Sequence, residues 1–237
     1  MNLSNLSMPL PSIHAMSLLG VETKRPLLTE QQRRRLADAA TLLKLPARAI
    51  VYRNGEPADS VFINGGGVVI SFKDMPSGKR RVAGFRFRAD LFGLADRGKY
   101  VNTARTVTPA TIYKIPIEIL TAMLRQDADL EFQFVCKLVH ELRQSQRKAI
   151  IVARRDAPGR IAMFVDMLRR TNEHGERQHD MIEMPMTRAD IGDYLNLAHE
   201  SVSRACRRLT NMGILEFEKG IAHIRDRARF EKLVARN

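Results

Sequence analysis

Short apolar stretches separated by turn-forming residues dominate the first half of the chain. Stretches short enough for single strands cover residues 49–52, 61–63, 68–72, 82–87 and 111–115. Turn-forming residues separate them at hairpin spacing, namely Asn54-Gly55, Asn64-Gly65-Gly66-Gly67 and Pro76-Ser77-Gly78. The pattern predicts an antiparallel barrel or jelly roll, preceded by a helix over residues 30–43.

Beyond Pro116 the apolar positions change to helical spacing. Asp127, Asp129 and Glu131 place negative charge at the start of a long helix, where the helix dipole favours it. A stripe along this helix, with steps of three and four residues, contains Val135, Leu138, Leu142, Ser145, Ala149 and Val152. Such spacing is typical of a two-helix seam, and alone it only slightly favours a dimer interface over packing on the chain's own barrel.

A second domain is predicted to begin near Asp156, which can cap a helix that has Pro158 in its first turn. The apolar face of that helix contains Ile161, Phe164, Val165 and Leu168. After the polar residues 171–180, residues 181–184 fit a short strand. The apolar spacing changes again after this strand.

Two short helices joined by a tight link follow. Thr187 and Asp190 have the form of a capping box at the start of the first helix. Residues 196–198 then lead to a helix over residues 199–212, closed by Gly213 as a left-handed cap. This arrangement predicts a helix-turn-helix, and a hairpin at residues 214–224 forms a wing after it.

A helical wheel divides the second of these helices into two faces. The apolar face contains Val202, Ala205, Cys206, Leu209 and Met212, and the polar face contains Glu200, Ser203, Arg204, Arg207 and Asn211. In a DNA major groove, Arg204 can hold guanine with two hydrogen bonds, Glu200 can accept from cytosine, and Ser203 can touch a neighbouring base. The sequence therefore predicts a base-reading surface.

The same spacing also fits a simpler role for this surface. Glu200 and Arg204 are four residues apart and can form a surface ion pair worth about 0.2–0.5 kcal/mol. The basic helix after a short turn, together with Arg188 placed to meet a phosphate, favours DNA reading over this alternative.

Composition narrows the classes of function. The net charge is +13 with a pI near 10.3, which indicates an acidic partner, either nucleic acid or an anionic membrane surface, and charge alone does not choose between them. Most of this charge lies outside the predicted DNA-binding domain, because residues 157–237 carry 14 Lys and Arg against 12 Asp and Glu.

We find no apolar run long enough for a membrane span and no secretory pattern, and we expect a cytoplasmic protein without a membrane partner. We find no phosphate-binding glycine loop, metal-ligand spacing or nucleophile beside a base, so an enzyme is not expected.

The run at residues 186–204, Met-Thr-Arg-Ala-Asp-Ile-Gly-Asp-Tyr-Leu-Asn-Leu-Ala-His-Glu-Ser-Val-Ser-Arg, resembles the signature of the Crp/Fnr family of bacterial transcription regulators. Residues 54–57, 82–85 and 90–93 resemble the family's cyclic-nucleotide-binding-type barrel. The resemblance implies an α+β fold with an N-terminal arm (1–22), a β jelly-roll sensor domain (23–116), a long dimerisation helix (117–155) and a C-terminal winged helix-turn-helix (156–237).

The pattern of Glu200, Ser203 and Arg204 is similar to the Fnr and FixK branch of that family. This resemblance implies a homodimer that reads TTGAT, four base pairs and ATCAA in double-stranded DNA, and that activates transcription through RNA polymerase. The expected phosphate contacts are Thr187, Arg188, Ser201 and Arg207. His199 is a further base-reading candidate, because a related branch places a base-contacting arginine there. The expected dimer interface contains Val135, Leu138, Leu142, Ala149 and Val152.

Two departures from the family's patterns bear on ligands. Residues 1–30 contain no cysteine, so we expect no iron–sulfur cluster. Leu94 stands where the cyclic-AMP branch has a glutamate, and residues 97–105 lack its Arg-Ser pair, so a cyclic nucleotide is not expected. We therefore expect no cofactor, and the small-molecule effector is unknown. The alternatives are an effector-gated or haem-gated regulator, with a ligand among six scattered histidines, and a nucleotide-binding signalling module.

Two cysteines, Cys136 and Cys206, are too far apart in the sequence to suggest a metal site. Cys206 lies among arginines, which lower a thiol pKa, so an oxidation switch that blocks DNA binding is one hypothesis. Its position on the apolar face favours the alternative, a buried and inert thiol.

Overall fold

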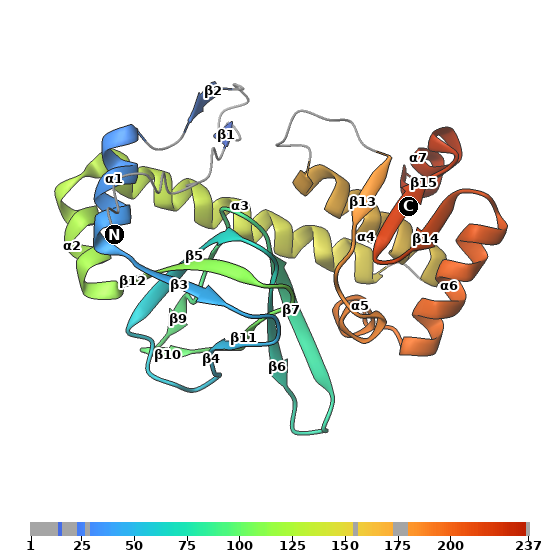
Figure 1. The fold of residues 1–237 in the computed structure, drawn as a ribbon, viewed down its shortest axis with the longest axis horizontal. Coiled ribbons are helices and arrows are strands. Elements are labelled where there is room, and N and C mark those ends of the chain that lie inside the picture. Colours follow the sequence, from blue (N-terminus) through green and yellow to red (C-terminus); the bar gives the residue numbers. More distant parts are fainter. Residues whose placement is uncertain (1–13, 16–22, 27–28, 154–155, 173–179, 236–237) are drawn as a thin grey trace. The chain divides into compact units, whose positions relative to one another are not determined.

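The computed structural model of the protein describes residues 14–15, 23–26, 29–153, 156–172 and 180–235 (Figure 1). Most of the predicted N-terminal arm, and two of the histidines, His174 and His179, lie outside these ranges. The chain divides into two compact units. The first contains Met1–Asp74 and Ala83–Gln144, and the second contains Met75–Val82 and Ser145–Asn237.

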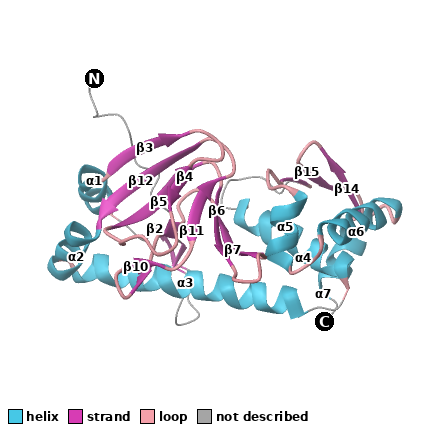
Figure 2. Ribbon diagram, turned by 90° about the horizontal axis from the view of Figure 1, so that it is seen from below, coloured by secondary structure: helices cyan, strands magenta, loops and turns pink. Residues whose placement is uncertain are grey.

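Two four-stranded antiparallel sheets form the barrel of the first unit (Figure 2). One sheet has the order β4-β11-β6-β7 and the other β3-β12-β5-β8. Their bounds are β3 Thr41–Leu45, β4 Ile50–Tyr52, β5 Ser60–Gly66, β6 Val69–Asp74, β7 Arg80–Arg86, β8 Leu91–Phe92, β11 Thr103–Thr106 and β12 Ala110–Pro116. The short pairs β1 His14–Ala15 with β2 Thr23–Pro26, and β9 Ala95–Asp96 with β10 Lys99–Tyr100, lie outside these sheets.

Stacked aromatic rings fill the centre of this barrel. The ring centroids of Tyr52 and Tyr100 are 4.0 Å apart, and Phe62 lies 5.3 Å from Tyr52 and 5.4 Å from Phe92. Gly93 has a φ of +81°, and a Cβ atom there would approach the Phe62 ring to 2.6 Å. Only glycine therefore lets the chain leave β8 so close to the aromatic cluster.

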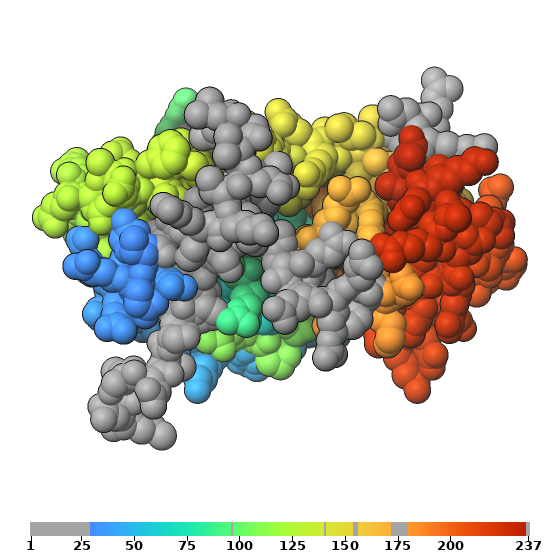
Figure 3. All heavy atoms as spheres, turned by 90° about the horizontal axis from the view of Figure 1, so that it is seen from above, coloured from blue at the N-terminus to red at the C-terminus, as the bar shows by residue number. Residues whose placement is uncertain are grey.

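A second cluster packs helices against the barrel. Helix α1 (Glu30–Ala39) contributes Leu36, and α2 (Ile117–Gln126) contributes Leu120; both pack with Ile115 of β12. Figure 3 shows the surfaces of the two helices, blue and yellow-green, side by side. The prediction of one helix over residues 30–43 was wrong at its C-terminal end, because residues 41–45 pair with β12 as strand β3.

The long helix α3 covers Ala128–Ala153. The Asp127 carboxylate accepts a hydrogen bond from the Leu130 amide at 2.9 Å, and it also holds Gln32 and Arg35 of α1. These contacts, with the Leu130 amide as the largest, lower the pKa of Asp127. The long helix therefore begins where the acidic residues predict, and the first part of the range 117–155 assigned to the dimerisation helix is the separate helix α2, because the chain is extended at Asp127.

In the second unit, helices surround a three-stranded antiparallel sheet of order β13-β15-β14. Its elements are α4 Ala157–Asn172, β13 Met181–Glu183, α5 Arg188–Leu195, α6 His199–Asn211, β14 Leu215–Glu218, β15 Ile221–Ile224 and α7 Arg227–Ala235. Asp156 caps α4 as predicted, with its carboxylate accepting from the Gly159 amide at 2.7 Å. The predicted apolar residues of α4 are all buried. Helix α7 was not predicted; its Phe230 is buried in the same core.

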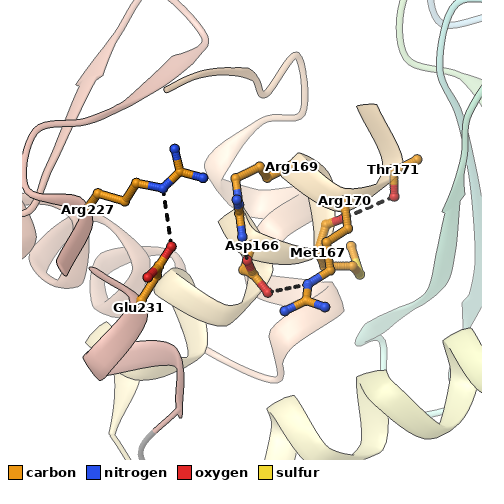
Figure 4. A network of polar contacts seen from close by, with 7 residues as sticks. All are labelled: Asp166, Met167, Arg169, Arg170, Thr171, Arg227 and Glu231. Carbon is orange, nitrogen blue, oxygen red and sulfur yellow. Dashed lines mark hydrogen bonds and ion pairs between the residues drawn. The ribbon is translucent and has the colours of Figure 1, made fainter. Parts of the chain in front are cut away.

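A charged cluster on α4 stabilises the helix that supports this core (Figure 4). Arg170 donates to the Asp166 carboxylate at 2.7 Å and Arg169 donates to it at 2.8 Å. Asp166 is nearly buried, whereas the neighbouring pair of Arg227 and Glu231 on α7 is exposed. In the part of the chain that the structure describes, no helix is long and apolar enough to cross a bilayer.

Candidate DNA-binding site

The first helix of the predicted helix-turn-helix begins with a reciprocal cap. The Asp190 amide donates to the Thr187 hydroxyl at 3.1 Å, and the Thr187 amide donates to the Asp190 carboxylate at 3.2 Å. This confirms the predicted capping box and fixes the N-terminus of α5.

The turn between α5 and α6 is tight. Asn196 has a left-handed backbone, with a φ of 55°, and the Leu197 amide donates to the Gly192 carbonyl at 2.9 Å. A Cβ atom at Gly192 would lie 2.7 Å from the Leu197 carbonyl oxygen. A residue without a side chain at position 192 therefore allows the chain to double back over α5, as a helix-turn-helix requires.

Helix α6 has the two faces that the wheel predicts. Its inner face is buried and contains Val202, Ala205, Cys206 and Leu209. Met212, predicted to belong to this face, is 38% exposed because it lies at the C-cap, where the chain turns away at Gly213. The packing of the inner face fixes which side of α6 is turned outward.

The three predicted base-reading side chains share that outer face. Glu200 and Arg204 are exposed, and Ser203 is half-buried between them. Among the described residues, Glu200 and Arg204 form no ion pair with each other; Arg204 instead donates to the Ser201 hydroxyl at 3.3 Å. The simpler ion-pair alternative is therefore not observed, and an exposed acceptor and an exposed guanidinium lie one helical turn apart. His199, also exposed, has its Nδ1 atom 4.0 Å from the Glu200 carboxylate.

The side chains predicted to contact phosphate differ in whether they already contact other residues of the second unit. Arg207 is exposed on α6, and Thr187 uses its hydroxyl in the cap. Arg188 donates to the Cys206 sulfur at 2.6 Å, and its guanidinium carbon lies 5.2 Å from the centroid of the Phe217 ring. The Arg188 side chain therefore joins α5 to α6 and the wing, a contact that the sequence did not reveal.

Both cysteines lie in surroundings that disfavour the reactive thiolate. Burial raises the pKa of Cys206, and the nearby Arg188 guanidinium opposes this shift without outweighing it. Burial also raises the pKa of Cys136 in α3. These directions favour the inert alternative over the oxidation-switch hypothesis for Cys206.

Comparisons with known proteins agree with this arrangement. Residues 159–233 match the Crp-like helix-turn-helix domain family, and residues 42–127 match the cyclic nucleotide-binding domain family. The transcriptional activator protein anr of Pseudomonas aeruginosa is 30% identical over 74% of this chain and 73% of its own length. The chain belongs to the Crp/Fnr family.

Two further relatives place this Crp/Fnr chain within the family. The nitrogen fixation regulation protein FixK of Bradyrhizobium diazoefficiens is 27% identical over 71% of each chain. The solved structure of FixK2 from Bradyrhizobium japonicum is 28% identical and matches with a TM-score of 0.75, covering 84% of this chain and 98% of that one. The predicted family, its Fnr and FixK branch, and the α+β fold are confirmed. The protein is a transcription regulator with a DNA-binding helix-turn-helix.

In this Crp/Fnr chain the predicted seam residues of α3 are accessible. Val135 is 46% exposed, Leu138 42% and Leu142 59%; Ala149 is also exposed and Val152 is half-buried. Phe132 and Ile150, which the sequence analysis missed, add to the exposed apolar residues of this helix. Among the α3 side chains that the structure describes, the buried ones are Leu130, Lys137 and Ile151, so packing within the chain does not account for the stripe.

A buried charge network lies where α3 meets the barrel of the first unit. The Lys137 ammonium is 3.0 Å from the Asp90 carboxylate and 3.2 Å from that of Glu141, which also pairs with Arg86 at 2.5 Å. Burial opposes the charged form, but the two carboxylates prevail and raise the pKa of Lys137. Leu94, which replaces the glutamate of the cyclic-AMP branch, is 43% exposed. In the described chain no group of three His, Cys, Asp or Glu side chains is placed to hold a metal ion.

Proposed function

We propose that this Crp/Fnr regulator is a homodimer that reads a TTGAT, four base pairs, ATCAA palindrome and activates transcription. The outer face of α6 carries the proposal. Glu200 and Arg204 are exposed there, with Ser203 between them, while the opposite face of the helix is anchored in the core. An acceptor and a fork-shaped donor on one turn match the edges of a C·G pair in the major groove.

The exposed stripe of α3 supports the dimer. A palindrome with half-sites about one helical turn apart requires two copies of α6 related by a two-fold axis. Three exposed apolar side chains, Val135, Leu138 and Leu142, have the spacing of a helix that pairs with a second copy. The proposed occupant of this surface is therefore the same helix of another chain.

The relatives support the direction of regulation. The anr protein of Pseudomonas aeruginosa is named a transcriptional activator, and FixK a nitrogen fixation regulation protein. Activation requires a contact with RNA polymerase, which we propose as the protein partner. Transcription in vitro from a promoter with the palindrome upstream should rise when the protein is added; a fall would show repression instead.

Selection of bound sequences from a random DNA pool tests the proposal. We expect enrichment of the TTGAT-type palindrome. Arg204→Ala should weaken binding to the selected duplex by about 1–3 kcal/mol and relax the preference for guanine, because two hydrogen bonds to that base are lost.

Lys232→Ala provides the matched control, because Lys232 carries the same charge at an exposed position on α7. It should change binding to the palindrome by less than about 0.5 kcal/mol. If Arg204→Ala and Lys232→Ala bind the selected duplex equally well, α6 does not read its bases through Arg204.

A further inference from the structure

The segment Met75–Val82, which follows β6 and includes the first three residues of β7, belongs to the second unit. Its Arg80 side chain bridges two carboxylates of α5. The terminal nitrogen Nη2 lies 2.7 Å from an Asp190 oxygen and 2.7 Å from an Asp193 oxygen, and Nε donates to Asp193 at 2.8 Å. One guanidinium therefore holds both acidic side chains of this helix.

Neighbouring residues of the same unit add to this contact. Arg81 donates to the Asn196 side-chain oxygen at 2.6 Å, at the left-handed turn that leads into α6. Lys148 donates to the Val82 carbonyl, and its ammonium lies 4.7 Å from the centroid of the Tyr194 ring on α5. The segment thus contacts both α5 and the turn that sets the direction of α6.

The Arg80 contact has a clear energetic reason. Asp190 is 3% exposed, and its carboxylate already caps α5 through Thr187. A buried carboxylate without a cation is costly, and Asp193 places a second negative charge beside it. Burial disfavours the charged guanidinium, but the two carboxylates outweigh this effect and raise the pKa of Arg80, so it stays charged.

We propose that Arg80 is a positioning residue for DNA recognition. It holds α5 and the following turn in the arrangement that presents α6 to the palindrome, and it neutralises two carboxylates on a helix whose N-terminus is expected to face phosphate. The inference rests on the proposed function.

Arg80→Ala and Lys79→Ala separate positioning from general charge. Lys79 is exposed on the same segment, so both variants lose one positive charge at nearly the same place. Binding is measured by fluorescence anisotropy with the selected palindrome and with a scrambled duplex. We expect Arg80→Ala to weaken binding to the palindrome by at least about fivefold more than Lys79→Ala does. On the scrambled duplex the two variants should match.

A double-mutant cycle identifies the partner. Asp193→Asn alone should also weaken binding to the palindrome, and Arg80→Ala with Asp193→Asn should bind no worse than Arg80→Ala within about twofold, because both changes break one contact. If Arg80→Ala does not fold, Asp193→Asn alone still tests the contact, because Asp193 is only partly buried and this variant should fold.

Three outcomes overturn the inference: equal behaviour of Arg80→Ala and Lys79→Ala, additive effects in the cycle, or equal loss on both duplexes together with a lowered melting temperature. The last outcome would show that Arg80 only stabilises the fold. Failure of the unchanged protein to select any palindrome would instead refute the proposed function, so the two failures are distinguishable.

Discussion

Asp166 and Glu231 carry the same charge in the second unit but differ in how much water reaches them (Figure 4). The Asp166 side chain is 9% exposed and pairs with two arginines, whereas that of Glu231 is 58% exposed and pairs with one. Water screens the exposed pair, so its contribution to stability is small. The buried carboxylate has little solvent to replace a lost partner, so its pairs matter more.

Asp166→Asn should therefore lower the free energy of unfolding by about 2 kcal/mol, because Arg169 and Arg170 lose their anion. Glu231→Gln is the control and should change it by less than about 0.5 kcal/mol. Urea denaturation measures both. Equal losses in the two variants would show that burial does not decide the strength of these pairs.

At the scale of the elements, the exposed apolar stripe of α3 leads to a prediction about the proposed dimer. Leu142 is 59% exposed in the middle of the apolar stripe. Leu142→Glu should dissociate the proposed dimer, because a charge would be buried at the seam, and it should weaken binding to the palindrome. Sedimentation velocity measures the dissociation.

Arg147→Glu introduces the same side chain at another exposed position of α3, about 140° around the helix from Leu142. It should leave the dimer intact. A dimer that survives Leu142→Glu would place the interface elsewhere on the molecule.

Helices with a strong local pattern were predictable from the sequence. Very short strands, and strands that form only by pairing with a distant segment, were not. The capping box at Thr187 and the two faces of α6 depend on residues close in sequence, so the helix-turn-helix was predicted with its outer residues. Strands β8 and β10 have two residues each, which is too short for an alternating pattern. Strand β3 exists because of its pairing with β12, a contact between distant segments, so residues 41–43 were assigned to the preceding helix.

The same limit applies to ion pairs between segments that are distant in the sequence. Arg80 and Asp190 are 110 residues apart in the chain, and Lys137 and Asp90 are 47 apart. No periodicity connects such pairs, so the pattern of the sequence does not reveal them. Glu200 and Arg204, by contrast, lie one turn apart on one helix, and their shared face follows from helical geometry alone.

At the scale of the whole molecule, the tyrosines provide a way to observe the first unit in solution. The chain has no tryptophan and 4 tyrosines. Burial raises the pKa of Tyr52 to about 12, and it also raises the pKa values of Tyr100 and Tyr113. All three belong to the first unit.

Stability should fall as the pH rises from about 10 to about 12. In that window the unfolded chain releases the tyrosine protons while the folded chain retains them, so ionisation favours unfolding. The rise in the pKa of Tyr52 from 10.0 to about 12 corresponds to about 2–3 kcal/mol. Thermal unfolding across this pH range, followed with tyrosinate absorbance, measures the effect. Tyr52→Phe should be less sensitive to alkali than the unchanged protein; equal sensitivity would exclude Tyr52 as the cause.

The assignment of Met75–Val82 to the second unit has a consequence for protein engineering. A fragment that starts at Ser145 would omit a segment that contacts α5, and it would leave Asp190 without Arg80. Chimeras that join the C-terminal half to the sensor domain of another protein should also include residues Met75–Val82. The second unit of this regulator, which would have to be transferred as a whole, is made of two separate segments of the chain.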